Sequence, residues 1–465
     1  MTATTWRVAG IVAGIVAGIF SCGVSVALAA EPTQQELLEK VNKLQTQVEQ
    51  LQAQVQAQQT PDKREVEATV DAMVKDAERR SRFLVTDGNL IGGWNADKQQ
   101  FYLASEDGNF YFHPGFLLQV RNAVNFRDNA KRGDNEILEG FEIRRAKFSF
   151  DGNVFTKDLT FKFQWQDSNN GGAPTLEYGY AQYVFAHDWH GADLGLRAGQ
   201  FKDPAFKEEA QTGDPTQLMV ERSLANVLVG GVSSGPLIQG VDLLLLGKDN
   251  PLHADLTLHD GDASGNTDFQ NVLPSGAKSD FGVAGRVDYK FFGDWADTAS
   301  MNGKGAKKDL LDVGGGVDFS QSDNTNAIRW DVDAQYLIAG RYTIFGALYG
   351  NNLDFRNQIG PGTRNDYGGV VEAGYFLNSA WEIAARYSLV RVDSDFKANG
   401  EDTFHEIGVG LSWFLGDDGS AGNHAKFSID LNYLPNGTPS ATGLDYLASP
   451  GDSQFVLRTQ FQLWL

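Results

Sequence analysis

The sequence predicts an all-β protein: a transmembrane antiparallel β-barrel of about sixteen strands, preceded by a short N-terminal α-helical coiled coil. Three observations carry this prediction: an export signal, an alternation of apolar and polar residues that recurs from about residue 110, and a strongly patterned final strand. In that strand one face suits lipid and the other suits water. The apolar set is Phe455, Leu457, Phe461, Leu463 and Leu465, and it alternates with Gln454, Val456, Arg458, Gln460 and Gln462, with Trp464 beside the terminus.

Residues 1–30 have the pattern of an export signal. One cation, Arg7, precedes an apolar run over residues 8–26, and a small-residue cleavage site follows over residues 27–30. The only cysteine, Cys22, lies inside this segment. The exported chain is therefore expected to hold neither a disulfide nor a thiol metal site.

The chain is strongly acidic, with a formal net charge of -21. This charge argues against nucleic acid as a partner. After residue 30, no apolar run reaches the length that a transmembrane helix needs. Mean hydropathy is -0.32 although 42% of residues are hydrophobic, as expected where only alternate residues of each strand face lipid.

The pattern of residues 31–84 predicts a periplasmic coiled-coil or helical segment. Its apolar residues are spaced alternately by four and three positions, which makes a stripe too narrow to be buried without a partner helix. A solvated helical spacer is the alternative interpretation. The coiled-coil seam comprises Leu37, Val41, Leu44, Val48, Leu51 and Val55.

Residues 85–109 are expected to form a linker or short strands, and residues 110–465 the barrel. Alternation places three strands directly, over residues 116–127, 146–150 and 159–166. With the final strand and twelve further candidates the count is sixteen, an even number as in closed bacterial barrels. The further candidates centre on Tyr180, Leu196, Leu243, Leu256, Val283, Val317, Val332, Ile344, Val371, Ile383, Val409 and Ile429.

Connections of two kinds support a barrel with distinct rims. Some are tight, such as the turn at residues 415–419, whereas the connection from Gln200 to Pro236 is long. Short turns on one rim and long loops on the other are typical of outer-membrane barrels. The long connection is expected to fold into the lumen and set the size limit.

Two segments resemble the phosphate-selective porin O and P family. The first, residues 141–152, is similar to that family's paired-arginine strand, and the second, residues 196–204 followed by 219–224, is similar to the strand that enters its constricting loop. The N-terminal coiled coil is also common in that group. The resemblance implies a homotrimer of sixteen-stranded barrels in the outer membrane of a Gram-negative type bacterium, passing small hydrophilic solutes or inorganic ions passively.

The resemblance stops at the phosphate-binding residues. Where the family has an arginine on its first strand, this chain has Leu117, and where it has a central lysine in the loop, this chain has Glu209. A carboxylate at a narrow constriction repels phosphate. Weak selectivity and no tight phosphate site are therefore expected.

The lumen-facing register supplies candidate pore residues. In the first interpretation these residues create a transverse electric field, with a basic side near Arg145, Lys147 and Lys162 and an acidic side near Glu208 and Glu209. In the alternative interpretation they pair across strands and only keep the lumen polar. Strict alternation points Arg144 outward unless its strand bulges. The candidates are Arg121, Arg127, Arg144, Arg145, Lys147, Lys162, Arg197, Lys202, Lys207, Glu208, Glu209 and Arg222.

No pattern indicates an enzyme, a metal or a cofactor. The seven histidines are scattered, and no Gly-x-Ser-x-Gly turn or phosphate-cradling loop is present. A passive channel is the first hypothesis. The second is a structural anchor whose coiled coil tethers the outer membrane to the cell wall. The third is a channel specific for an organic acid or sugar. Aromatic residues are common in strands, so those of this segment do not by themselves support it: Tyr178, Tyr180, Tyr183 and Phe185.

Overall fold

The computed structural model describes residues 90–96, 98–128, 136–167, 174–230, 236–261, 264–266, 279–322, 325–355 and 362–465. The expected export signal and coiled-coil seam lie outside these residues. Within them, no helix is long and apolar enough to cross a membrane.

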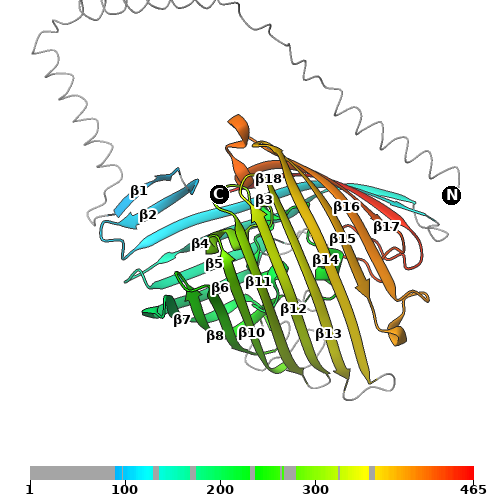
Figure 1. The fold of residues 1–465 in the computed structure, drawn as a ribbon, viewed down its shortest axis with the longest axis horizontal. Helices are drawn as coiled ribbons and strands as arrows, with labels where there is room; N and C mark the ends of the chain where they lie inside the picture. Colours follow the sequence, from blue (N-terminus) through cyan, green and yellow to red (C-terminus); the bar gives the residue numbers. More distant parts are fainter. Residues whose placement is uncertain are drawn as a thin grey trace, which may run out of the picture. The chain divides into compact units, whose positions relative to one another are not determined.

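Sixteen antiparallel strands form a closed barrel, which confirms the predicted fold class (Figure 1). Strands adjacent in sequence pair with each other, and the last strand pairs with the first of the barrel, so the sheet has no free edge. Each predicted strand centre lies within an observed strand. The barrel strands are β3 (Tyr111–Arg127), β4 (Ile137–Asn153), β5 (Leu159–Asp167), β6 (Thr175–Trp189), β7 (Ala192–Lys202), β8 (Leu237–Gly247), β9 (Leu252–His259), β10 (Ser279–Phe292), β11 (Leu310–Ser322), β12 (Thr325–Ile338), β13 (Tyr342–Phe355), β14 (Thr363–Asn378), β15 (Trp381–Arg391), β16 (Thr403–Phe414), β17 (Ala425–Leu434) and β18 (Gln454–Trp464).

Two further strands precede the barrel. β1 (Leu90–Asn95) and β2 (Gln100–Ser105) form a hairpin, and β2 joins the sheet where Leu103 pairs with Phe112 of β3. This hairpin lies within residues 85–109, the segment expected to be a linker or short strands. It pairs with the first residues of β3, which β18 does not reach, and takes no part in barrel closure.

Alternation along each strand separates a polar lumen from an apolar exterior. In β18, Gln454, Arg458 and Gln462 are buried in the lumen. The opposite face of the barrel leaves large apolar side chains uncovered, such as Leu348, which is 60% exposed, and Val371, which is 58% exposed. A continuous belt of such side chains is the surface that a bilayer covers.

The two rims differ as expected. Most connections on the rim that holds the carboxyl terminus are tight, such as those over residues 189–192 and 378–381; we call this the turn rim. The opposite rim, the loop rim, carries the long connections over residues 202–237 and 434–454. Outside the β7–β8 connection, the described connections contain the short 3₁₀ turns η4 (Trp295–Ala299), η5 (Ser394–Phe396), η6 (Asp417–Gly419) and η7 (Gly422–His424).

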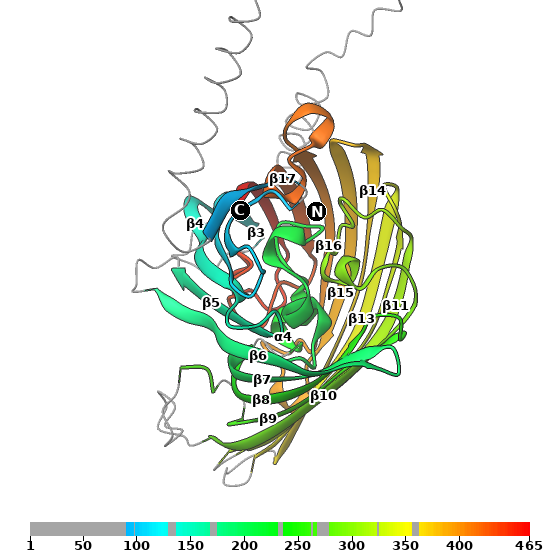
Figure 2. The same ribbon diagram turned by 90° about the vertical axis from the view of Figure 1, so that its left-hand side faces the viewer.

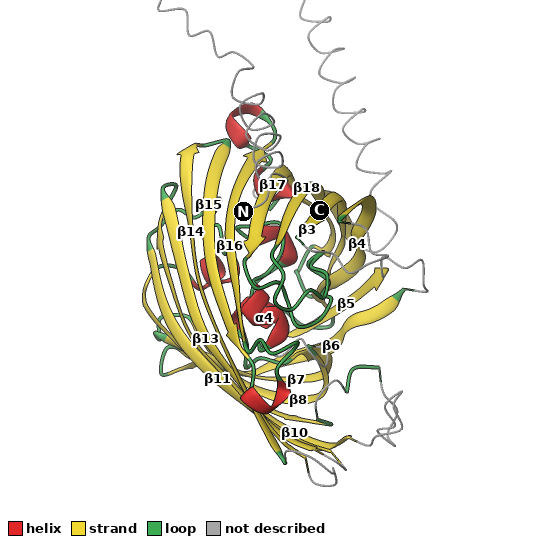
Figure 3. Cartoon of the chain, turned by 90° about the vertical axis from the view of Figure 1, so that its right-hand side faces the viewer, coloured by secondary structure: helices red, strands yellow, loops and turns green. Residues whose placement is uncertain are grey.

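The β7–β8 connection folds into the lumen, where α4 is visible inside the ring of strands (Figures 2 and 3). Its described part, residues 203–230, is called the inserted loop. It contains a π-helical turn, η1 (Lys207–Gln211), a 3₁₀ turn, η2 (Asp214–Thr216), and α4 (Leu224–Leu228). Ser223 begins α4, because its hydroxyl accepts a hydrogen bond from the Asn226 amide.

Apolar side chains attach the inserted loop to one side of the barrel. Leu224, Ala225 and Val229 are fully buried in a cluster with lumen-facing Phe345 and Tyr349 of β13. Burial of this surface stabilises the loop against β13–β18. These apolar contacts therefore fix the loop to this side of the barrel.

Candidate functional site

Carboxylates on the wall behind the inserted loop are occupied by the loop itself. The Lys207 amide donates to Asp331 (3.0 Å), the Val220 amide to Asp430 (3.0 Å) and the Leu224 amide to Glu406 (2.8 Å). The Lys207 ammonium forms a fully buried ion pair with Asp312. These four carboxylates, Asp312, Asp331, Glu406 and Asp430, are called the acidic wall. Loop donors neutralise or hydrogen-bond each of them.

Cations gather on the opposite side of the lumen. We call them the basic wall, and they come from β3, β4 and β7: Arg121, Arg144, Arg145, Lys147 and Lys202. Arg144 belongs to this set because β4 bulges, so that Gln119 pairs with Arg145 while the next residue, Val120, pairs with Ile143. The extra residue turns adjacent arginines toward the same face. Both arginines reach the inserted loop.

Glu221 of the inserted loop meets three of these arginines. Its carboxylate lies 2.7 Å from Arg121, 2.6 Å from Arg144 and 2.8 Å from Arg145. Burial favours the neutral acid, but the three guanidinium charges outweigh it and hold the pKa of Glu221 well below its usual range. Glu221 therefore remains a carboxylate at any physiological pH.

Two more loop carboxylates extend this contact. Asp214 lies 2.6 Å from Lys147, and Glu209 lies 2.8 Å from Lys202. Arg222, also in the loop, bridges the two at 2.5 Å and 3.1 Å. Burial opposes ionisation of both acids, yet the surrounding cations lower the pKa of each. Ion pairs thus join the basic wall to the inserted loop inside the lumen.

The predicted acidic residue Glu208 lies elsewhere than expected. Its carboxylate accepts hydrogen bonds from the Ser223 amide (2.6 Å) and hydroxyl (2.9 Å) and from the Tyr349 hydroxyl (2.7 Å), and it is fully buried. It therefore supports the loop from behind. Asp214 and Glu221 take the place facing the cations that was expected for Glu208.

Besides Lys162 on β5 and Arg222 in the inserted loop, three candidate cations lie outside the basic wall. Lys207 points to the acidic wall, and Arg127 lies at the loop-rim end of β3. Arg197 pairs across strands with Asp242 of β8 and lies 3.5 Å from Asp255. Arg197 thus follows the alternative interpretation, pairing within the sheet.

Three adjacent cavities follow the basic wall through the lumen. The loop-side cavity, about 310 Å³, is lined by Arg144, Arg145, Glu221 and Leu444 among others. A middle cavity of about 150 Å³ is lined by Leu117, Lys147 and Asp214, and it shares Lys147 and Asp214 with the first.

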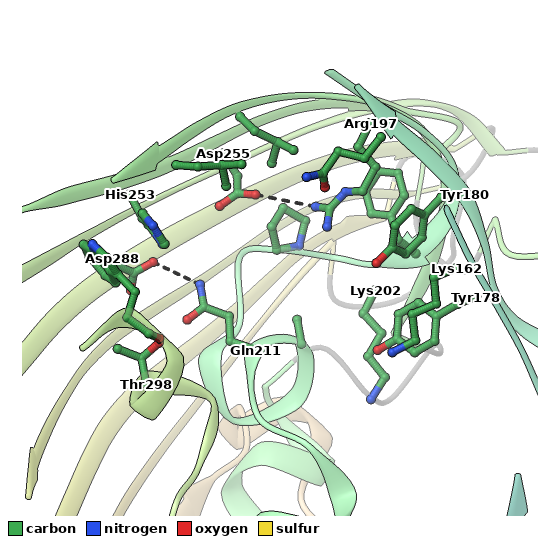
Figure 4. Close-up of a pocket in the computed structure, with 17 residues that line it drawn as sticks. Lys162, Tyr178, Tyr180, Arg197, Lys202, Gln211, His253, Asp255, Asp288 and Thr298 are labelled. Carbon is green, nitrogen blue, oxygen red and sulfur yellow. Dashed lines mark hydrogen bonds and ion pairs between the residues drawn. The ribbon is translucent and has the colours of Figure 1, made fainter. Parts of the chain in front are cut away.

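The third cavity, of about 340 Å³, lies toward the turn rim and is called the turn-side chamber. It shares Lys162, Tyr178 and Lys202 with the middle cavity. Figure 4 shows Lys162, Tyr178, Tyr180 and Arg197 on one side of it and His253, Asp255 and Asp288 on the other. The cavities therefore form a series from the loop rim to the turn rim.

One group of carboxylates has the proximity that a metal ion needs. Single oxygens of Asp288, Asp312 and Asp333 lie within 4.8 Å of one another. Arg286 contacts Asp288 at 2.6 Å and Asp333 at 2.7 Å, and Lys207 occupies Asp312. Protein cations already fill this cluster, so we assign no metal to it.

Asp203, where the inserted loop begins, is expected to make stability depend on pH. Burial, and then the charge of Asp318, raise its pKa to about 7. Between its ordinary pKa and about pH 7 the unfolded chain binds fewer protons than the folded one, so stability falls as pH rises through this window. Thermal unfolding followed by circular dichroism should show this loss in the natural chain and a smaller loss in Asp203→Asn. Parallel pH profiles would contradict it.

Comparisons with known proteins agree on the fold. No family model matches the chain, and a search of curated proteins found no match. Among solved structures, the anion-selective porin from Comamonas acidovorans is 13% identical, with a TM-score of 0.52, over 76% of this chain and 99% of that one. OmpF of Salmonella typhi, in a complex with daunomycin, is 13% identical, with a TM-score of 0.51, over 76% and 98%. At this identity the likeness concerns the fold alone, and the chain has the sixteen-stranded barrel fold of outer-membrane porins.

Proposed function

We propose that the protein is a passive outer-membrane channel for small hydrophilic solutes and ions. The observation that carries this proposal is the asymmetric lumen: the inserted loop is fixed to the acidic wall, and a series of cavities follows the basic wall. Solutes would pass between the basic wall and the loop. The solute gradient supplies the energy.

The charges along this path favour weak ion selectivity. Each cation of the basic wall has a carboxylate partner, most of them in the inserted loop. Paired charges leave little net field for a passing ion. The channel therefore differs from a phosphate-selective porin, in which unpaired cations would replace the hydration shell of the anion.

The finer expectations rest on the sequence: the two resembling segments imply the trimer, the export-signal pattern implies cleavage, and the heptad spacing implies the coiled coil. These expectations are the homotrimer, removal of residues 1–30, and a periplasmic place for residues 31–84. The apolar exterior is compatible with both lipid and neighbouring copies as contacts. We therefore propose a trimer related to the phosphate-selective group in architecture and distinct from it in selectivity.

Leu117 offers a direct gain-of-function test. It is 5% exposed, pairs with Lys147 across β3 and β4, and lines the middle cavity. Leu117→Arg would add a cation to this cavity. The added charge should change the energy of a passing ion by about 1 kcal/mol or more, so the chloride-to-potassium permeability ratio is expected to rise several-fold. Reversal potentials in a potassium chloride gradient measure it. A ratio equal to that of the natural chain would place Leu117 off the path.

Single-channel recording in planar bilayers tests the proposal as a whole. We expect ohmic steps in groups of three, a reversal potential close to zero, and currents that phosphate leaves unchanged. Strong anion selectivity with phosphate block would show that unpaired cations govern the pore. A folded barrel without conductance would favour the structural anchor.

A further inference from the structure

We propose that the turn-side chamber recognises organic monocarboxylates, with Lys162 as the group that binds the carboxylate. This inference rests on the proposed function, because the chamber is reached through the channel. It deepens that function by naming a substrate class. The residues that carry it are Lys162, Tyr178, Tyr180, Phe201, Asp255 and Asp288.

Lys162 is the cation that the chamber leaves available. The other two cations lining the chamber are paired, Lys202 with Glu209 and Arg197 with Asp242. In the described chain, by contrast, no carboxylate oxygen lies within ion-pair distance of the half-buried Lys162 ammonium. The nearest carboxylates that act on it, Asp151 opposite it in register and Glu177, lie beyond that distance, so this partly dehydrated ammonium still attracts an anion.

An aromatic surface adjoins this ammonium. The Lys162 Nζ atom lies 4.7 Å from the centroid of the Tyr178 ring. Tyr178 packs edge-on against Tyr180 at 6.2 Å, and Tyr180 against Phe201 at 6.5 Å. Such a surface gives an apolar or planar solute body contact area that inorganic ions cannot use. The combination therefore favours an organic anion over phosphate or chloride.

The far side of the chamber limits the solute to one carboxylate. Asp255 and Asp288 line it, and Asp288 is also bound by Gln211 at 3.0 Å (Figure 4). These carboxylates already occupy the cations beside them, with Arg197 3.5 Å from Asp255 and Arg286 2.6 Å from Asp288, so a second anionic group would find no unoccupied cation on this side. At about 340 Å³ the chamber has the size of known small-molecule sites. A monocarboxylate with an uncharged or cationic opposite end fits both sides.

The chamber also lies on the expected path. Lys162 and Tyr178 line the middle cavity as well as the chamber. An anion that has crossed the ion pairs between the basic wall and the inserted loop therefore meets Lys162 next. Occupation of this site would obstruct chloride current.

The test is a titration of benzoate into the chloride current of the full exported chain in planar bilayers, with acetate and phosphate as comparison anions. We expect a saturable decrease with benzoate, a weaker one with acetate, and none with phosphate. Lys162→Gln should raise the half-blocking benzoate concentration about tenfold or more, the change expected when a hydrogen bond to a charged group is lost. The matched control is Lys157→Gln, which removes the same charge from an exposed turn between β4 and β5.

A second variant keeps the charge and removes the aromatic surface. Tyr178→Leu should weaken benzoate block and leave acetate block as in the natural chain. Equal block of Lys162→Gln and Lys157→Gln, or absence of saturable benzoate block in a conducting natural chain, would overturn the inference while the channel stands. Phosphate block as strong as benzoate block would overturn the organic class. Loss of conductance in the natural chain would instead overturn the proposed function.

Discussion

Replacing Glu221 by glutamine is expected to make the channel clearly anion-selective. The change leaves Arg121, Arg144 and Arg145 without their shared carboxylate beside the loop-side cavity. A unit charge acting over about 10 Å at an effective dielectric constant of about 20 changes the energy of a passing ion by about 1.7 kcal/mol. The change has opposite signs for chloride and potassium, so the chloride-to-potassium permeability ratio should rise by more than about tenfold. Reversal potentials measure the change. The isosteric amide keeps hydrogen-bonding capacity, which limits collapse of the loop.

Glu139→Gln is the matched control for this variant. Glu139 lies on β4, the strand that carries Arg144 and Arg145, and is exposed at the loop rim. Removal of its charge there should change the permeability ratio little. If Glu221→Gln and Glu139→Gln gave the same ratio as the natural chain, the arginine cluster would not lie beside the conducting path. A cation-selective result would contradict the assigned charge pattern altogether.

Lys207→Ala is expected to loosen the inserted loop and raise the conductance. Lys207 and Asp312 are both fully buried, and the substitution leaves the Asp312 carboxylate without its cation. Removing one partner of a buried ion pair costs about 3–5 kcal/mol. The loop should then leave the acidic wall part of the time, so that single-channel records show larger and noisier steps and thermal unfolding begins at lower temperature.

Lys308→Ala separates this effect from a general loss of charge. Lys308 and Asp294 form an ion pair at 2.9 Å with side chains 65% and 48% exposed. Exposed pairs contribute about 1 kcal/mol or less, so this variant should conduct like the natural chain. Unchanged steps in Lys207→Ala as well would mean that the loop is held by its apolar contacts and amide hydrogen bonds alone.

The strands were predictable because their pattern is local. Alternation along a strand depends on lipid at one face and polar surroundings at the other, and both act on each residue separately. Bulges break this rule. At Arg144 the extra residue brings a side chain inward that strict alternation points outward, and only the pair of adjacent arginines hinted at it.

The contacts of the inserted loop were not predictable in the same way. Glu208 and Glu209 are adjacent, yet within the π-helical turn one faces β13 and the other faces Lys202. The rotation of that turn depends on contacts with strands distant in sequence. Glu221 lies within residues 219–224, part of a segment that resembles the phosphate-selective family, but alternation does not predict the direction of a side chain outside the strands.

The two interpretations of the lumen charges, pairing across strands and a transverse field, each describe part of the lumen. Glu372 and Arg386 face each other in register on β14 and β15 at 2.7 Å, as the pairing interpretation expects. Arg145 instead reaches a loop carboxylate, Glu221. The difference depends on which wall the inserted loop covers, and that follows from barrel closure, which a linear sequence does not display.

Thiol modification inside the barrel tests the central claim, that a water-filled path follows the basic wall. Cys22 is the only cysteine, so a chain of residues 31–465 offers no other thiol. Gln164 lines the middle cavity, whereas its neighbour Phe163 is 41% exposed on the outer face of β5. A negatively charged methanethiosulfonate reagent should lower the conductance of Gln164→Cys and leave that of Phe163→Cys unchanged. Unaltered conductance in a fully conducting Gln164→Cys channel would contradict the path.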